Sequence, residues 1–173
     1  MSPREVIAQP LTADLFSPFG DVIERGTAPL PINAGMCDRH HDLARLDFGT
    51  GRAGISLFDG QARRFPYRLD LVERHPEGSQ AFIPLNGVPL LITVCPDKGG
   101  RPGTPRAFVM APEQAINLHR GTWHGVLAPI DAQGLYAVVD HIGPALNLEE
   151  HLFKIPWIIL PPAQSVAKKG SGR

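Results

Sequence analysis

The sequence contains little cysteine, no excess of charge and no long apolar run. Its two cysteines, Cys37 and Cys95, do not stand in a Cys-x-x-Cys pair, so nothing in the sequence demands a disulfide. Seventeen basic residues balance seventeen acidic ones. This balance argues against nucleic acid or an anionic membrane as a partner and favours a small molecule or a second copy of the chain. Because no apolar run reaches about eighteen residues and no export signal is visible, we expect a cytoplasmic protein.

Proline and glycine, by contrast, are abundant. Eighteen of each are spread along the 173 residues, a composition typical of many short strands joined by turns. Alternating or short apolar stretches predict strands at 19–23, 55–58, 67–73, 81–85, 89–95, 106–110, 115–119, 124–128 and 135–141. Their regular spacing indicates an all-β barrel or sandwich, in one domain over residues 1–165.

Five other segments are predicted to lie outside the strands. A short helix is expected over 12–16 with Thr12 as its N-cap, and a loop over 27–38 because of its prolines. Residues 97–103 predict an exposed hairpin loop, and residues 147–151 one helical turn. The small and basic residues 166–173 are expected to form a disordered tail.

The first polar cluster precedes a buried strand. Glu73 and His75 are two residues apart, so on an extended strand their side chains leave the same face. Gln80 follows after a turn, and Gly87 comes seven residues later. This order resembles the first motif of cupins, small β-barrels in which two histidines on alternate positions precede a glutamate and a glycine. Glu73 would replace the first histidine and Gln80 the glutamate.

The second polar cluster lies in residues 117–124. His119, Gly121 and His124 are similar in spacing to the second cupin motif, with His119 replacing a proline. The resemblance implies a cupin-type double-stranded β-helix barrel (jelly roll) with a few short helices. It also implies that Glu73, His75, Gln80 and His124 point at one spot inside that barrel.

This set of side chains suits a divalent transition metal. Imidazole nitrogen and carboxylate oxygen are common ligands of Ni, Zn and Mn, and open positions would admit a substrate. Gln80 is a weak neutral ligand, so the same residues could instead hold a substrate by hydrogen bonds without metal. We expect no organic cofactor.

Longer matches point to one family. The stretches that carry them are 19–24, 32–35, 39–43, 73–84, 106–108 and 119–124. Together they resemble the ureidoglycolate lyase family over roughly residues 8 to 160. The resemblance implies release of urea from (S)-ureidoglycolate, leaving glyoxylate, in the breakdown of allantoin and purines. It also implies a homodimer.

The chemistry of that reaction assigns roles to the polar residues. A base must take the hydroxyl proton of ureidoglycolate and an acid must protonate the departing urea nitrogen. We expect His75 and His124 to do this in either order, with Glu73 orienting them or accepting a proton. The predicted substrate-binding residues are Gln80, His119, Arg106, Asn33, Arg39, His41 and Asp140.

Three other functions stay open. A different cupin enzyme, such as a sugar-phosphate isomerase or epimerase, would need a phosphate clamp, and the sequence shows neither a glycine-rich phosphate loop nor a dense basic pocket. A metal-dependent dioxygenase would prefer a stronger iron site. A cupin that binds a small acid without turnover is the third alternative, and such a module usually accompanies a DNA-binding segment.

Overall fold

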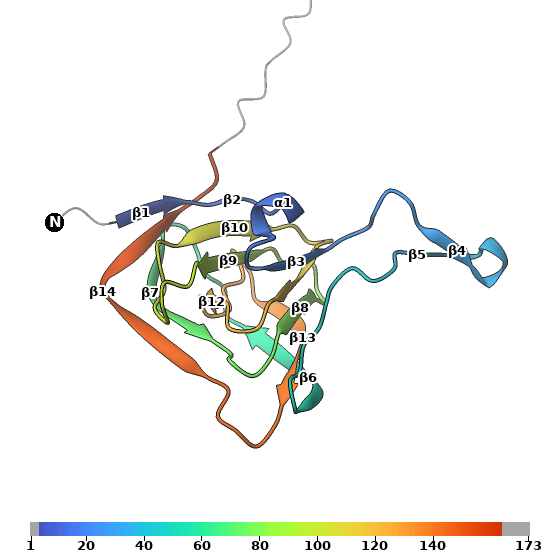
Figure 1. The fold of residues 1–173 in the computed structure, drawn as a ribbon. Helices are drawn as coiled ribbons and strands as arrows, with labels where there is room; N and C mark the ends of the chain where they lie inside the picture. The colour runs from blue at the N-terminus through green and yellow to red at the C-terminus, as the bar shows by residue number, and fades with distance from the viewer. Residues whose placement is uncertain (1–3, 164–173) are drawn as a thin grey trace, which may run out of the picture.

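The computed structural model describes residues 4–163, and almost all of its regular structure is β (Figure 1). The predicted tail over 166–173 lies outside the described residues. The elements are β1 (Arg4–Ile7), β2 (Gln9–Pro10), α1 (Ala13–Phe16), β3 (Gly20–Ile23), β4 (Leu30–Ile32), η1 (Asn33–Gly35), β5 (Cys37–Arg39), β6 (Arg52–Gly60), β7 (Tyr67–Arg74), β8 (Gln80–Pro84), β9 (Leu90–Cys95), β10 (Arg106–Met110), β11 (Ala115–Leu118), β12 (Trp123–His124), β13 (Gly134–Ile142) and β14 (Glu149–Leu160).

Strands β6 to β13 form a jelly roll. They divide between two sheets, with the order β6-β13-β8-β11 in one and β7-β12-β9-β10 in the other. Successive strands change sheet, except that β9 and β10 pair as neighbours in the same sheet. Strand β3 extends the first sheet to five strands, and β1, β14 and β2 extend the second to seven. Alternation of successive strands between two facing sheets is the arrangement of the jelly roll and of cupins. The prediction of an all-β, cupin-type barrel is therefore confirmed.

The barrel core follows from the alternation of side chains along each strand. Ile92 and Val94 of β9 belong to the inner cluster together with Phe82, Phe108 and Tyr136. The intervening residues of β9 point to the other face, where a second apolar cluster lies beneath β14 and β1. Burying each large apolar side chain contributes about 1.5–3 kcal/mol. This packing fixes which face of each strand meets the interior, and with it the direction of the polar side chains near the strand ends.

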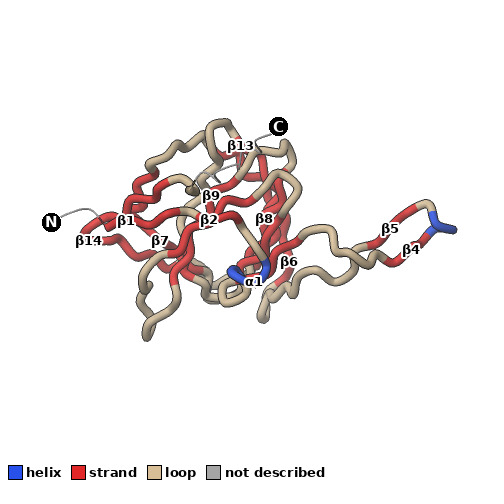
Figure 2. Tube along the Cα trace, turned by 90° about the horizontal axis from the view of Figure 1, so that it is seen from above, coloured by secondary structure: helices blue, strands red, loops and turns tan. Residues whose placement is uncertain are grey.

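The predicted loop over 27–38 is wrong in part, because β4 and β5 pair there as a hairpin. Asn33, Ala34 and Gly35 have φ values of 53°, 55° and 83°, which close the turn between them. The hairpin extends away from the barrel (Figures 1 and 2). We call residues 27–42 the arm.

Two more predictions about local structure need correction. The helical turn expected over 147–151 is instead the start of β14, which pairs with β7 from Glu149 onward. The strand expected over 124–128 ends at His124. The short helix is confirmed, since the Thr12 hydroxyl accepts a hydrogen bond from the Leu15 backbone N–H. None of the helices within residues 4–163 has the length and apolar character needed to span a bilayer.

Candidate active site

Glu73, His75 and His124 meet at one end of the barrel interior. Glu73 lies near the end of β7, opposite His124 of β12 in the same ladder. His75 follows β7 directly, two residues after Glu73, and so returns to the same face. Each side chain offers one nitrogen or oxygen atom, and these three atoms all lie within 4.8 Å of one another. We call these three residues the Glu73 cluster.

Backbone carbonyls fix the orientation of both imidazole rings. His75 Nδ1 lies 2.7 Å from the carbonyl oxygen of Asn147, and His124 Nδ1 lies 2.9 Å from that of Thr122. A carbonyl oxygen can only accept, so each Nδ1 carries the hydrogen and donates it. The neutral rings therefore present the lone pair of Nε2 to the cluster. Both Nε2 atoms are buried and without a hydrogen-bond partner within residues 4–163.

Burial and charge tune the protonation of these groups. Burial lowers the pKa of His75, and the hydrogen bond that its ring donates to the Asn147 carbonyl only partly offsets that effect. The contact with His124 lowers the pKa of Glu73, although burial opposes it. Glu73 Oε1 lies 3.6 Å from His124 Nε2, which is longer than a good hydrogen bond. The cluster at neutral pH thus combines an ionised carboxylate with a neutral His75.

A second polar pair comes from the opposite sheet. Gln80 of β8 is aligned with Asp140 of β13, and its Nε2 donates a long 3.4 Å hydrogen bond to Asp140 Oδ2. Gln80 Oε1 and Asp140 Oδ1 are buried without partners within residues 4–163. Gln80 is also aligned with Leu118, whose side chain belongs to the barrel core, so this pair faces the same interior as the cluster. Unpaired buried oxygens of this kind could accept hydrogen bonds from the NH groups of a ligand.

Arg106 lies in the same cross-strand row as the cluster. Glu73 is aligned with His124, His124 with Val94, and Val94 with Arg106 on β10. Residues directly opposite one another in antiparallel strands share a face. The guanidinium lies 5.2 Å and 5.6 Å from the rings of Phe108 and Phe19, which belong to the barrel core. Arg106 is therefore the predicted arginine that the strand register directs toward the barrel interior.

His119 lies apart from the Glu73 cluster. Its Nε2 contacts Asp21 Oδ1 at 3.2 Å, and the hydrogen bond between Asn117 and Asp21 lies beside it. Leu118, between Asn117 and His119, points into the barrel core. His119 therefore faces the outer side of β11, along a cleft of about 460 Å³. The structure gives no contact between His119 and His124.

The three remaining predicted residues belong to the arm. Asn33 lies in its turn, Arg39 at the end of β5, and His41 just after that strand. The arm extends away from the barrel (Figure 2), and the group formed by Glu73, His75 and His124 includes none of these three residues.

The backbone carbonyls of Asn147 and Thr122 are the contributors that the sequence did not reveal. Asn147 also accepts a hydrogen bond on its side-chain oxygen from the Glu77 backbone N–H, at 2.8 Å. This contact ties the segment before β14 to the turn after His75. Because every residue has a carbonyl, no residue-type pattern marks such a contact in the sequence.

The donor set fits a divalent metal. Two imidazole nitrogens and one carboxylate oxygen, close together and partly or fully buried, are ligands that Zn, Ni and Mn accept. The two Nε2 atoms lack partners in the described part of the chain, and a metal ion would satisfy both. Three protein ligands would leave further positions for substrate oxygens.

Comparisons with known proteins identify the family of this chain. The family model for ureidoglycolate lyase matches residues 3–160. The ureidoglycolate lyase of Rhodobacter capsulatus is 59% identical over 158 residues, covering 90% of this chain and 98% of the relative. That of a Chelativorans species is 50% identical over 163 residues, covering 92% and 98%.

One solved structure shows a weaker likeness. RmlC from Streptococcus suis, determined in complex with dTDP-D-xylose, is 16% identical with a TM-score of 0.42 and covers 55% of this chain and 46% of its own. The family is established by the sequence matches, which span nearly the whole chain. This chain belongs to the ureidoglycolate lyase family.

Proposed function

We propose that this chain cleaves (S)-ureidoglycolate to glyoxylate and urea. Family membership and the convergence of Glu73, His75 and His124 within 4.8 Å support the proposal. The reacting carbon of ureidoglycolate bears a hydroxyl, a carboxylate and a urea nitrogen. Its cleavage needs one group to remove the hydroxyl proton and another to protonate the leaving nitrogen.

His75 is the better base of the two histidines. Burial lowers its pKa, which keeps the ring neutral near pH 7, and its Nδ1–H is donated to Asn147. The lone pair of Nε2 is then available for the hydroxyl proton. His124 shares a 3.6 Å contact with the ionised Glu73, so a proton can pass between these two groups beside the departing urea nitrogen. In this assignment the proton that His124 delivers is the one that His75 removes from the hydroxyl. It would pass through the Glu73 carboxylate, whose Oε1 lies 3.9 Å from His75 Nε2 and 3.6 Å from His124 Nε2.

A divalent metal held by Glu73, His75 and His124 would bind the hydroxyl and carboxylate oxygens of the substrate and make that hydroxyl more acidic. The three side chains would then serve as ligands. With Glu73 used as a ligand, Asp140 would be the carboxylate that accepts or donates a proton, and its charge acts on His75. Gln80, as a neutral amide, would serve as a further weak ligand or as a hydrogen-bond partner of the ureido group.

Arg106 is the proposed partner of the substrate carboxylate. The row from Glu73 through His124 and Val94 brings it to the same face of the same sheet. Adjacent strands are about 4.8 Å apart, so Arg106 starts about 10 Å from His124, which leaves space for a small acid between them. A planar guanidinium binds two carboxylate oxygens at once.

The direct test is product formation by the purified protein. Urea and glyoxylate should appear in equal amounts from (S)-ureidoglycolate, and the (R)-enantiomer should be left intact. Absence of both products with either enantiomer, with and without added Ni, Zn or Mn, would overturn the proposed activity.

Metal binding needs a measurement that does not depend on turnover. After dialysis against a chelator, calorimetric titration with each ion should show one site per chain. Glu73→Gln should weaken that site about 10- to 100-fold, because a charged ligand is replaced by a neutral one of the same size. Arg68→Gln, on the exposed face of β7, should leave it unchanged. Equal affinity in Glu73→Gln and the unaltered chain would exclude the Glu73 cluster as the metal site.

We further propose a homodimer in which the arm of one chain lies on the partner. The outer face of the five-stranded sheet carries a cross-strand row of Leu57, Ala137 and Ile83. Leu57 is 66% exposed, and Met36 at the tip of the arm is 86% exposed. Exposed apolar side chains on a sheet face and on a projecting hairpin favour burial against a second copy. Such packing would bring Asn33, Arg39 and His41 toward the partner.

The proposed cellular role follows from the proposed reaction. We propose that the chain acts in the breakdown of allantoin and purines, because ureidoglycolate arises in that breakdown and carries nitrogen that is released as urea. We also propose that it acts in the cytoplasm. Cells lacking the chain should lose growth on allantoin as nitrogen source and accumulate ureidoglycolate. Normal growth without accumulation would contradict this role.

A further inference from the structure

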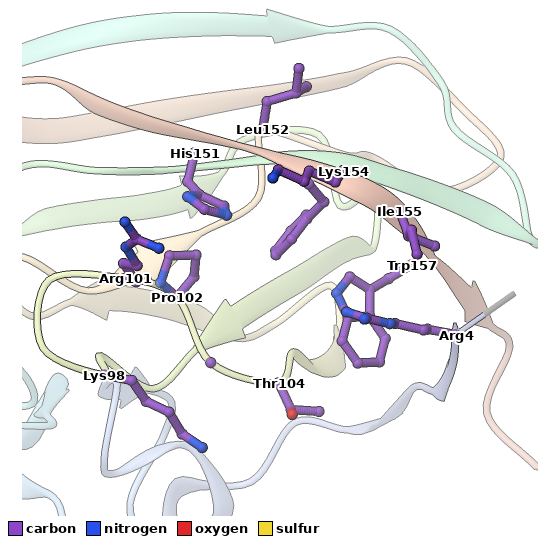
Figure 3. A pocket seen from close by; sticks show the side chains of 12 residues that line it. Arg4, Lys98, Arg101, Pro102, Thr104, His151, Leu152, Lys154, Ile155 and Trp157 are labelled. Carbon is purple, nitrogen blue, oxygen red and sulfur yellow. The ribbon is translucent and has the colours of Figure 1, made fainter. Parts of the chain in front are cut away.

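A second cleft, of about 550 Å³, lies outside the barrel, between β14 and the loop that joins β9 to β10 (Figure 3). None of its lining residues belongs to the Glu73 cluster. Arg4, the loop residues Lys98 and Arg101, and Lys154 of β14 contribute to its wall. Three segments that are distant in the sequence thus bring four cations to one cleft, which no local sequence pattern predicts.

The cleft is basic in a chain without net charge. Its lining includes four Lys or Arg side chains and one histidine, but no Asp or Glu, although the chain holds seventeen acids and seventeen bases. Within residues 4–163, none of the four cations forms an ion pair with a carboxylate. Unpaired cations that surround one hollow create a positive potential there, which attracts anions.

The two ends of the cleft differ in chemistry. Figure 3 shows Arg101, His151 and Lys154 toward one end, and Trp157 with Arg4 toward the other. The Arg4 guanidinium lies 5.4 Å from the centre of the Trp157 ring. Phe153 adds a second aromatic side chain to the wall. The indole Nε1 of Trp157 is buried and has no acceptor within residues 4–163, so a donor stays unused at this end.

We propose that this cleft binds a small phosphorylated molecule that carries a flat ring, as a nucleotide does. Phosphate oxygens would lie between Arg101 and Lys154, because guanidinium and ammonium groups bind them through charge-assisted hydrogen bonds. The ring would lie against Phe153 and Trp157, since flat rings stack on aromatic side chains. A cleft of this size accommodates a ligand of nucleotide dimensions. The site is distinct from the proposed lyase site.

The test compares three probes by calorimetry with the full-length protein: ATP, tripolyphosphate and adenosine. ATP should bind at one site per chain and more tightly than either of the other two, because only ATP offers both charge and ring. It should also quench the fluorescence of Trp157, and this change should be lost in Trp157→Phe. Equal affinity for ATP and tripolyphosphate would overturn the ring subsite, and absence of binding by all three probes would overturn the site.

Variants of the lining residues test whether ATP binds in this cleft. Arg101→Gln and Lys154→Gln together should weaken ATP binding at least about 10-fold, because two charge-assisted contacts are lost. Arg25→Gln is the matched control, since Arg25 lines a different cleft beside β3 and the arm. Equal weakening in the double variant and in the control would show that binding reflects overall charge and would overturn the proposal. Lyase turnover measured without ATP should be unchanged in all of these variants.

Discussion

Glu73 and His124 face each other across β7 and β12, with Glu73 Oε1 3.6 Å from His124 Nε2. The pair is held by strand register, so neither side chain relies on a flexible loop for its position. His75 directly follows β7 and joins this pair, with its ring centre 5.2 Å from that of His124. A carboxylate and two imidazoles placed by sheet geometry are ready for proton transfer or for metal binding.

Replacement of Arg106 should weaken substrate binding more than turnover. Arg106→Lys keeps the charge but loses the planar fork, and we expect KM to rise about 10-fold or more while kcat changes less. Steady-state kinetics on (S)-ureidoglycolate measure both constants, with Arg68→Gln as a control on the exposed side of β7. An unchanged KM in Arg106→Lys would remove Arg106 from the carboxylate site.

Apolar contacts between chains should control the oligomeric state. Met36→Glu and Leu57→Glu each place a charge on a side chain that is more than half exposed in the single chain. Burying that charge in an interface is costly, so we expect the dimer to dissociate at least about 100-fold more readily. Light scattering across a dilution series reports the mass. A wild-type protein that is monomeric at all concentrations, or a Met36→Glu dimer as stable as wild type, would contradict the proposed arm contact.

Acidification should destabilise the fold through His75. Burial lowers the pKa of His75 in the folded chain, so the unfolded chain takes up a proton more readily. The contribution to stability is present above the unfolded pKa of about 6.5 and is lost as pH falls through the lower folded pKa. The melting temperature of chelator-treated protein should therefore fall below about pH 6.5, and fall less in His75→Asn. His151→Asn serves as the control, and an identical pH dependence in wild type and His75→Asn would contradict the account.

The two thiols should differ in reactivity. Cys95 is buried, and burial raises the pKa of its thiol to about 12, so little thiolate forms near neutral pH. Cys37 lies exposed on the arm. A thiol reagent should label Cys37 in the native protein and Cys95 only after unfolding. Mass spectrometry of labelled wild type and of labelled Cys37→Ser, which retains only Cys95, would distinguish the two sites. Rapid native labelling of Cys95 would contradict the core assignment.

Much of the barrel could be predicted because strand alternation and turn residues are local signals. The spacing of Glu73 and His75 likewise predicted a shared face, and the structure brings both beside His124. The segment that begins β14 was misleading, since Asn147, Glu149 and Glu150 are polar and favour no strand on their own. Pairing with β7 decides its conformation, and that partner lies far away in the sequence. The arm was misread for a related reason, because its prolines suggested a loop, whereas β4 and β5 pair there as a hairpin.

The parts of the site that the sequence did not reveal depend on long-range contacts. Carbonyls of Asn147 and Thr122 orient the imidazoles, and the four cations of the second cleft come from three separate segments. His119 fits the expected motif spacing, yet it lies beyond Leu118, whose side chain occupies the interior face. A shift of one residue along a strand moves a side chain to the opposite face of the sheet.

Turnover by His124→Asn tests the central claim most directly. The substitution removes Nε2 from the Glu73 cluster while keeping a polar side chain that fills part of the same space. We expect kcat for release of urea and glyoxylate from (S)-ureidoglycolate to fall at least about 100-fold, with the melting temperature within a few degrees of wild type and with His151→Asn near full activity. A folded His124→Asn variant that turns over within a factor of about three of wild type would show that the Glu73 cluster is not the catalytic centre.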